Sequence, residues 1–479
     1  MDSIKRRATL SLLSSYASQF ATTATSLVTK IVLAHLIAPD DLGLYAKALL
    51  VLLAGDVLVD LGVSQHIIRE RHRPYGNLLA LRFTIALVLV GLIEVFVGRF
   101  HAWDAAFPPV MRAMAVVIII KALSSVPTLY LDRELLIQRS LLPELTRLLV
   151  TGVVSIGLAY YHYGVWALVW GTVAGEAVFA IMIWRAAAGR MPVELTLRHS
   201  VSLVLGGKYL FLIALMGFAL QQGHVAILGT LVDDRQLGYY TMAATLVVLV
   251  SKVVETAVYR VIYPILCEYR DDTAAMGRAY RQATLAVYAI EAPIYFYLLF
   301  NASVVVPAVL GHKWMQAAVL VRALSVAGLV NPFCTFGYEV VRARKKDSVL
   351  TSSMVIGAVS MMVFGYVLTL RYGTLGMVAA TYLIFGAVPV IVSVYRILRP
   401  DFLLLARQIS VVYAASLVPM AAVSLGFSSI PAMGAAIAGL LIPACWYTFY
   451  RIYANGLGRS TLQTLMSGRS APVEAGVAE

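Results

Sequence analysis

The sequence predicts an all-α protein that crosses a membrane many times. Of its 479 residues, 60% are hydrophobic and only 13% are charged, and the mean hydropathy is +0.83. The surface of a soluble protein needs far more charge than this. The apolar residues fall into about fourteen segments, most of them long enough for the roughly 20 residues that a bilayer-spanning helix requires. A membrane barrel would instead show alternating segments of about 10 residues.

Short polar turns separate the apolar segments, and each segment is expected to form one helix. We predict helices near residues 10–37, 42–67, 78–98, 110–131, 141–160, 165–185, 200–232, 237–266, 282–308, 315–337, 349–370, 374–395, 408–426 and 432–453. The turns are too short to hold a soluble domain. The stretch after Gly456 has the composition of a disordered end.

The distribution of positive charge predicts the orientation of these helices. If the N-terminus is cytoplasmic, 24 of the 38 Lys and Arg residues lie in cytoplasmic turns or tails, and only 4 lie in outer turns. This asymmetry predicts that both termini are cytoplasmic. The net charge of +13 is therefore mainly a topology signal. Nucleic-acid binding is not predicted, because no basic run lies on a soluble domain.

The chain contains an internal repeat. Residues 32–45 (VLAHLIAPDDLGLY) align without a gap with residues 227–240 (ILGTLVDDRQLGYY), 195 positions later. A second pair, residues 163–169 and 372–378, has an offset of 209. Duplicated multi-helix halves are common in transporters, because the substrate path then lies between two similar lobes. The repeat therefore predicts transport.

The sequence lacks the patterns of common enzymes and metal sites. Its three Cys and eight His residues are dispersed along the chain. No zinc-protease, phosphate-loop or nucleophile-elbow motif occurs in it. We therefore expect no catalytic residues, no metal site and no bound cofactor.

Several motifs together resemble a known family of transporters. In chain order they are residues 36–45 (LIAPDDLGLY), 127–134 (PTLYLDRE), 163–169 (YGVWALV), 237–243 (LGYYTMA), 263–264 (YP) and 337–343 (GYEVVRA). They resemble the Wzx-type oligosaccharide flippases, which are polysaccharide exporters of the multidrug/oligosaccharidyl-lipid/polysaccharide (MOP) superfamily. The resemblance extends over about residues 5–400. Such proteins often carry an Asp in the seventh helix, where this chain has Gln222, Gly223 and His224, so a mechanism that depends on that Asp is not carried over.

The resemblance implies a fold, a substrate and a set of partners. The implied fold has two six-helix lobes in a V, over residues 1–195 and 196–400, then two helices over 401–455 and a disordered cytoplasmic tail over 456–479. The implied substrate is an oligosaccharide on undecaprenyl diphosphate. It would be flipped across the bacterial inner membrane for O-antigen, exopolysaccharide or capsule synthesis. The implied protein partners are a polysaccharide polymerase and co-polymerase.

Cations inside the predicted helices are candidate ligands for the diphosphate. A charge at a helix centre costs roughly 2.5 to 3.5 kcal/mol on insertion scales, so such residues usually have a function or a partner. The candidates are Lys121, Lys252, Arg260, Lys30 and Arg322. Ion pairing is the alternative, and Lys252 with Glu255 has the i,i+3 spacing for it. Interfacial positions are predicted for Lys47, Arg147 and Lys208.

Embedded acids and tyrosines provide further candidates. Carboxylates at membrane depth can couple transport to H⁺ or Na⁺, and His can titrate as well. The candidate coupling residues are Asp60, Glu255, Glu176 and His224. Asp60 and Glu255 are repeat mates, although a duplicated packing or ion-pair position would explain them equally well. The candidate sugar contacts, which flank the charged stretch, are Tyr259, Tyr263, Tyr295 and Tyr297.

Two other functions stay open at this point. A polytopic membrane glycosyltransferase or polymerase would usually carry a substantial outer loop with catalytic groups, and none of the outer turns is long enough. A cation or drug antiporter of the same superfamily would favour an acidic cavity, and the embedded cations argue against one.

Overall fold

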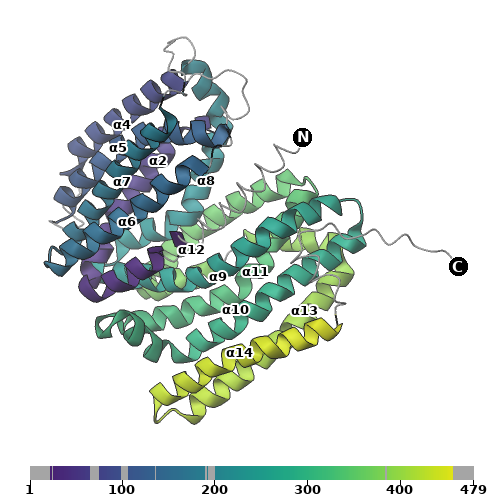
Figure 1. The fold of residues 1–479 in the computed structure, drawn as a ribbon. Coiled ribbons are helices and arrows are strands. Elements are labelled where there is room, and N and C mark those ends of the chain that lie inside the picture. Colours follow the sequence, from purple (N-terminus) through teal and green to yellow (C-terminus); the bar gives the residue numbers. More distant parts are fainter. Residues whose placement is uncertain are drawn as a thin grey trace. The chain divides into compact units, whose positions relative to one another are not determined.

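The computed structural model describes residues 22–23, 25–64, 75–98, 106–134, 136, 138–188, 191, 200–382 and 386–456. These residues form helices and contain no strand, which confirms the all-α fold class. Among the described residues, a short apolar helix spans Thr25–Leu36. The elements that follow are α2 (Pro39–Asp60), α4 (Tyr75–Val97), α5 (Phe107–Arg133), α6 (Gln138–Tyr160), α7 (Val165–Ala187), α8 (Ser200–Leu231), α9 (Asp234–Glu268), α10 (Thr273–Leu310), η2 (His312–Trp314), α11 (Ala317–Ala343), α12 (Asp347–Tyr382), α13 (Ala387–Gly426) and α14 (Pro431–Gly456) (Figure 1).

The chain is a multi-pass membrane protein. Among the described residues, eleven helices are long and apolar enough to cross a membrane. One of these spans, Asp347–Arg399, corresponds to α12 and the first part of α13 and covers two of the predicted segments. Helix Thr25–Leu36 contains the described part of the first predicted segment, and α9 contains the eighth. The structure therefore has helix at all fourteen predicted positions.

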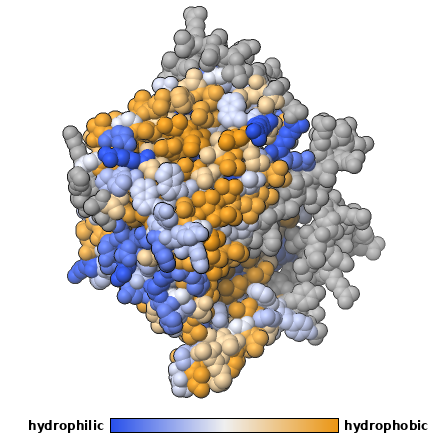
Figure 2. All heavy atoms as spheres, turned by 60° about the vertical axis from the view of Figure 1, so that its left-hand side comes forward, coloured by the Kyte–Doolittle hydropathy of each residue, from blue (hydrophilic) through white to orange (hydrophobic). Residues whose placement is uncertain are grey.

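Hydrophobic side chains on the helix surfaces agree with a lipid environment. Large hydrophobic residues are exposed on α4, where they are Leu87, Val88, Leu92, Val95 and Phe96. Hydrophobic residues also cover much of the face shown in Figure 2. Water would penalise such a surface, whereas hydrocarbon chains solvate it well.

The structure divides into two compact units. The first contains Met1–Met242, Pro307–Ala317 and Met354–Ile384, and the second contains Ala243–Val306, Ala318–Ser353 and Phe385–Glu479. The lobe boundary predicted near residue 195 falls within 192–199, outside the described residues. The lobes that the resemblance implies therefore stay a prediction.

The first unit holds a tightly packed bundle of α2, α4, α5, α6 and α7. Met111, Met114 and Ile118 of α5 form a buried core with Ala48 and Leu52 of α2. Small residues bring α6 and α7 together, because a Cβ at Gly171 would overlap Ser155 and a Cβ at Gly175 would overlap Thr151. Close approach at small residues is the usual way in which membrane helices gain packing contacts.

The second unit has its own core, which α9, α10, α11 and α13 build. Buried members include Leu266, Tyr280, Phe336 and Val394. An ion pair between Arg281 Nε of α10 and Asp401 Oδ1 of α13, at 3.2 Å, adds a polar contact. Helix α14 packs against α13.

Backbone breaks show where predicted segments begin and end. The repeated Tyr-Gly dipeptides place Gly164 (φ 55°) before α7 and Gly373 (φ 59°) inside α12, so both copies use a backbone conformation that favours glycine. Helix α2 ends at Asp60 rather than near residue 67 as predicted. The reason is that Leu61 and Gly62 both have positive φ, which a right-handed helix does not accept.

Candidate functional site

Two acidic residues of α2 lie one helical turn apart and contact cations on neighbouring helices. Asp56 forms an ion pair with Lys121 of α5. Asp60 forms an ion pair with Arg82 of α4 and accepts a hydrogen bond from Ser64 Oγ at 2.5 Å. Residues spaced by four project from one helix face, so both carboxylates lie on the same side of α2. These two ion pairs are the first part of the candidate site.

The two ion pairs differ in exposure. The side chains of Lys121 and Asp56 are 28% and 31% exposed, whereas the Arg82 side chain is only 3% exposed. A nearly buried guanidinium needs a fixed anionic partner, because loss of that anion would leave an uncompensated buried charge. The Lys121 ammonium is more accessible and is better placed to exchange its carboxylate for another anion.

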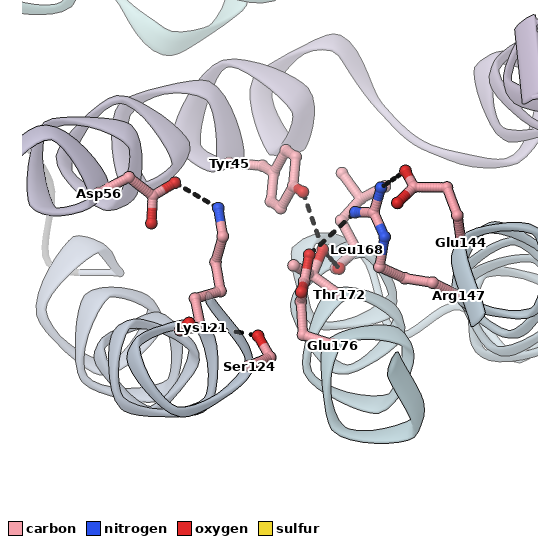
Figure 3. A network of polar contacts seen from close by, with 9 residues as sticks. All are labelled: Tyr45, Asp56, Lys121, Ser124, Glu144, Arg147, Leu168, Thr172 and Glu176. Atoms are coloured by element: carbon pink, nitrogen blue, oxygen red, sulfur yellow. Dashed lines mark hydrogen bonds and ion pairs between the residues drawn. The ribbon is translucent and has the colours of Figure 1, made fainter. Parts of the chain in front are cut away.

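A second charged cluster joins α6 to α7 (Figure 3). Arg147 of α6 contacts Glu144 Oε1 at 2.5 Å and Glu176 Oε1 of α7 at 2.9 Å. One turn before Glu176, the Thr172 hydroxyl lies 2.8 Å from the Tyr45 hydroxyl of α2. The two sets of contacts place polar groups on three helices, α2, α6 and α7, of an otherwise apolar bundle.

A cavity of about 180 Å³ lies beside the Tyr45–Thr172 hydrogen bond. Its polar lining includes Lys30, Tyr45 and Thr172, while most of its wall is apolar. Lys30 thus faces a cavity within the first unit, between helix Thr25–Leu36 and helices α2, α6 and α7. Lys30 and Tyr45 of α2 therefore line the same cavity. Lys121, another predicted ligand, contacts α2 through Asp56.

The predicted cations of the second unit lie on α9 and α11. Lys252 is an exposed residue of α9. Arg322 of α11 is partly buried and donates a hydrogen bond from Nη2 to Ser303 Oγ of α10, at 2.8 Å. The side chains of Glu255, Tyr259 and Arg260 lie outside the described part of the structure, and so does that of Lys208. Their predicted roles stay predictions.

The remaining aromatic candidates have different surroundings. Tyr295 is fully buried, and its hydroxyl forms a hydrogen bond with Ser251 Oγ. Tyr297 is partly buried, and Tyr263 lies under the guanidinium of Arg342, 4.8 Å from the ring centroid. The cation over the Tyr263 ring is half exposed, because the Arg342 side chain is 51% accessible.

The candidate coupling residues also lie in different surroundings. Glu176 is buried and paired with Arg147, and Asp60 is paired with Arg82. His224 of α8 is partly buried, and its ring lies 5.6 Å from that of Tyr240. The two acids therefore belong to ion-pair clusters, which are compatible both with a packing role and with titration coupled to movement.

Lys47, for which an interfacial position is predicted, has its side chain buried in an ion pair. Its side chain is 3% exposed, and its Nζ lies 2.5 Å from Asp234 Oδ1 at the start of α9. Position along the helix suggested an interface, but the packing of α9 and α8 over α2 buries the residue. The repeat alone does not predict this contact, although Asp234 is the repeat mate of Pro39, which lies two turns before Lys47 on α2.

Comparison with known proteins identifies a family and a fold. Residues 32–319 match the family model described as "Polysaccharide biosynthesis protein". A search of the curated proteins finds no match. Among solved structures, a "Lipid II flippase MurJ, inward closed conformation" aligns over 92% of this chain and 99% of its own, with a TM-score of 0.73 and 15% identity.

Two further structures are described as multidrug resistance MATE family transporters of the MOP superfamily. The inward-facing one aligns over 81% of this chain and 95% of its own, with a TM-score of 0.57 and 15% identity. The outward-facing one aligns over 83% and 96%, with a TM-score of 0.50 and 16% identity. At such low identity these likenesses show a shared fold, which spans nearly the whole chain.

Proposed function

Because this chain belongs to the polysaccharide biosynthesis protein family, we propose that it flips a lipid-linked oligosaccharide across a membrane by alternating access. The proposal rests on the match to the family together with the similarity of the fold to that of a flippase. The family model covers residues 32–319, and a structure titled as a lipid II flippase aligns over 92% of the chain. The internal repeat adds the duplicated construction that transporters of this kind use.

The proposed substrate is an oligosaccharide on undecaprenyl diphosphate. Such a molecule combines an apolar chain with a diphosphate of at least two negative charges, so its carrier needs cations within the membrane. Lys121 is suited to this task because its side chain is 28% exposed and its counter-ion, Asp56, is on another helix. In this proposal the diphosphate takes the place of Asp56. Further proposed contacts are Lys30, Lys252, Arg260 and Arg322.

We extend the proposal to the driving force. Asp60 and Glu176 are carboxylates held by cations inside the helix bundle. A carboxylate that loses its cation during a conformational change raises its affinity for H⁺ or Na⁺. Coupling to a gradient of either ion would then follow from repeated breaking of these pairs. His224 and Glu255 are secondary candidates.

The proposed setting is the bacterial inner membrane, with both termini in the cytoplasm. The excess of Lys and Arg in the turns assigned to the cytoplasmic side supports this orientation. A polymerase and a co-polymerase for the surface polysaccharide are the proposed partners, because a flipped unit has to be consumed on the outer side.

Deletion of the gene tests the proposal. A flippase mutant should keep synthesising the lipid-linked oligosaccharide and accumulate it on the cytoplasmic leaflet, where a membrane-impermeant glycan-modifying reagent cannot reach it in intact spheroplasts. Complementation with the wild-type chain should restore access by the reagent. A strain that stops making the lipid-linked unit altogether would instead identify an enzyme of the pathway.

A drug antiporter is the competing function, since two structures with the same fold are described as multidrug resistance transporters. The charges in the first unit do not decide between the two, because Lys121, Arg82 and Arg147 each contact a carboxylate. Drug sensitivity of the same deletion strain does decide. Hypersensitivity to cationic drugs with unchanged oligosaccharide distribution would favour the antiporter.

A further inference from the structure

The two copies of the repeated motif contact each other in the first unit. Helix α2 begins at Pro39 and α9 begins at Asp234, its repeat mate. A Cβ at Gly43 would overlap the backbone carbonyl of Asp234, and a Cβ at Gly238 would overlap that of Pro39. Gly43 and Gly238 are also repeat mates, so the contact is reciprocal, as in a twofold interface. The duplicated Leu-Gly-x-Tyr motif thus holds two helix ends backbone to backbone.

One buried ion pair breaks this symmetry. The ammonium of Lys47 lies 2.5 Å from Asp234 Oδ1, and the two side chains are 3% and 11% exposed. The repeat mate of Lys47 is Met242, so the second copy offers no equivalent cation. A Cβ at Gly229 of α8 would lie 3.4 Å from Cγ of Lys47, so the stem of the lysine runs beside this helix. Lys47 is therefore a buried cation at the place where the two repeats meet.

Separation of α2 from α9 would remove the Asp234 carboxylate from Lys47. At the glycines themselves the two backbones lie against each other, because a Cβ on either residue would overlap the other backbone. Part of the resistance is electrostatic, because a charge that loses a buried partner is strongly destabilised. An anion that replaced Asp234 would offset this cost, and the proposed substrate contains one.

We propose that Lys47 is a binding residue for the diphosphate of the substrate, and that Asp234 occupies it while α2 and α9 are in contact. This inference rests on the proposed function and adds a residue to its site. It also gives the substrate a role in the cycle. Bound diphosphate, by taking over Lys47, favours separation of the two repeats at this end of the helices.

The experiment uses three variants of the full-length chain. Lys47→Met removes the cation, Asp234→Asn removes its carboxylate, and the double variant removes both without leaving an unpaired buried charge. A matched control is the Asp40→Asn/Arg235→Gln double variant. Asp40 and Arg235 join the same two helices with a 3.2 Å ion pair, but their side chains are 53% and 59% exposed. Pairs exposed to that degree contribute little.

Binding is measured with farnesyl diphosphate on purified protein, and export is measured at equal amounts of membrane-inserted protein. The Lys47→Met/Asp234→Asn double variant should fold normally, yet bind the probe at least about tenfold more weakly, as loss of one charge-assisted contact implies. Its export should fall similarly. Asp234→Asn should bind the probe more tightly than wild type, because the competing carboxylate is gone. The Asp40/Arg235 control should match wild type in both measurements.

Wild-type binding and export in the Lys47→Met/Asp234→Asn double variant would overturn the inference and leave Lys47 with a structural role. Unchanged probe binding by Asp234→Asn would also overturn it. Failure of the wild-type protein to bind farnesyl diphosphate would contradict the proposed function, and with it the inference. The two failures are therefore distinguishable.

Discussion

Lys121 of α5 contacts Asp56 of α2, which lies 65 positions earlier in the sequence. This pair leads to the first prediction. Lys121→Ala should lower the yield of folded protein, because Asp56 loses its cation. The expected cost is about 1–3 kcal/mol, less than for a fully buried pair because both side chains are partly exposed. A second change, Asp56→Asn, should restore the yield.

The same variants separate a structural role of Lys121 from diphosphate binding. If Lys121 only neutralises Asp56, the Lys121→Ala/Asp56→Asn double variant should recover export along with folded protein. If Lys121 binds the diphosphate, as proposed, export per inserted protein should stay low. Lys121→Arg should keep part of the activity, because the charge persists while the geometry changes.

The Asp60–Arg82 pair leads to a second prediction, in which the acid is removed instead of the cation. The Arg82 side chain is almost fully buried, so Asp60→Asn should leave a buried guanidinium without its carboxylate and cost about 3–5 kcal/mol. Arg82→Leu combined with Asp60→Asn should recover much of the thermal stability. Thermal unfolding of the purified variants measures this.

Transport by the stable Asp60→Asn/Arg82→Leu double variant then tests coupling. Low transport with intact binding of farnesyl diphosphate is the expected result if Asp60 takes part in coupling. Full transport would assign the pair to packing alone.

The helices were predictable because their signal is local. Each apolar segment is continuous in the sequence, and hydrophobicity over about 20 residues is enough to identify it. The ends of the segments were less predictable. Helix α2, for example, ends at Asp60, because the next residue, Leu61, has a positive φ. Nothing in the residues after Asp60 shows that break except Gly62.

The partners of the charged residues could not be predicted, because they depend on which helices pack together. Lys121 could have faced any of the embedded acids, and the structure selects Asp56. The i,i+3 spacing predicts a pair of Lys252 with Glu255 within one helix, and this stays a prediction. The sequence missed the pair of Lys47 with Asp234. That contact requires knowing that the two repeats meet at their glycines.

Packing of α6 against α7 leads to a prediction about stability alone. Gly171→Ala should destabilise the protein by about 1–3 kcal/mol, because the new methyl group would overlap Ser155 and lie 2.9 Å from the carbonyl oxygen of Thr151. Gly157→Ala is the matched control on α6, since a Cβ there would meet no atom within 4 Å. The control should be neutral or slightly stabilising. Equal melting temperatures for the two variants would contradict the close packing of these helices.

Trp314 leads to the last prediction. The indole Nε1 donates a hydrogen bond to the carbonyl oxygen of Ala34 at 2.7 Å, near the end of helix Thr25–Leu36, and the ring is fully buried against Tyr239. Trp314→Phe keeps an aromatic ring but removes the donor, so it leaves a helix-terminal carbonyl unsatisfied. The expected loss is about 1–3 kcal/mol.

The neighbouring residue supplies the comparison for Trp314. Lys313 Nζ donates to the carbonyl oxygen of His35 at 2.9 Å, but this contact is exposed, so water can replace the ammonium. Lys313→Gln should therefore change the melting temperature much less than Trp314→Phe does. Equal melting temperatures for the two variants would show that the buried indole contact does not anchor the end of helix Thr25–Leu36. A lower melting temperature for Trp314→Phe alone would show that η2 anchors this helix through Trp314.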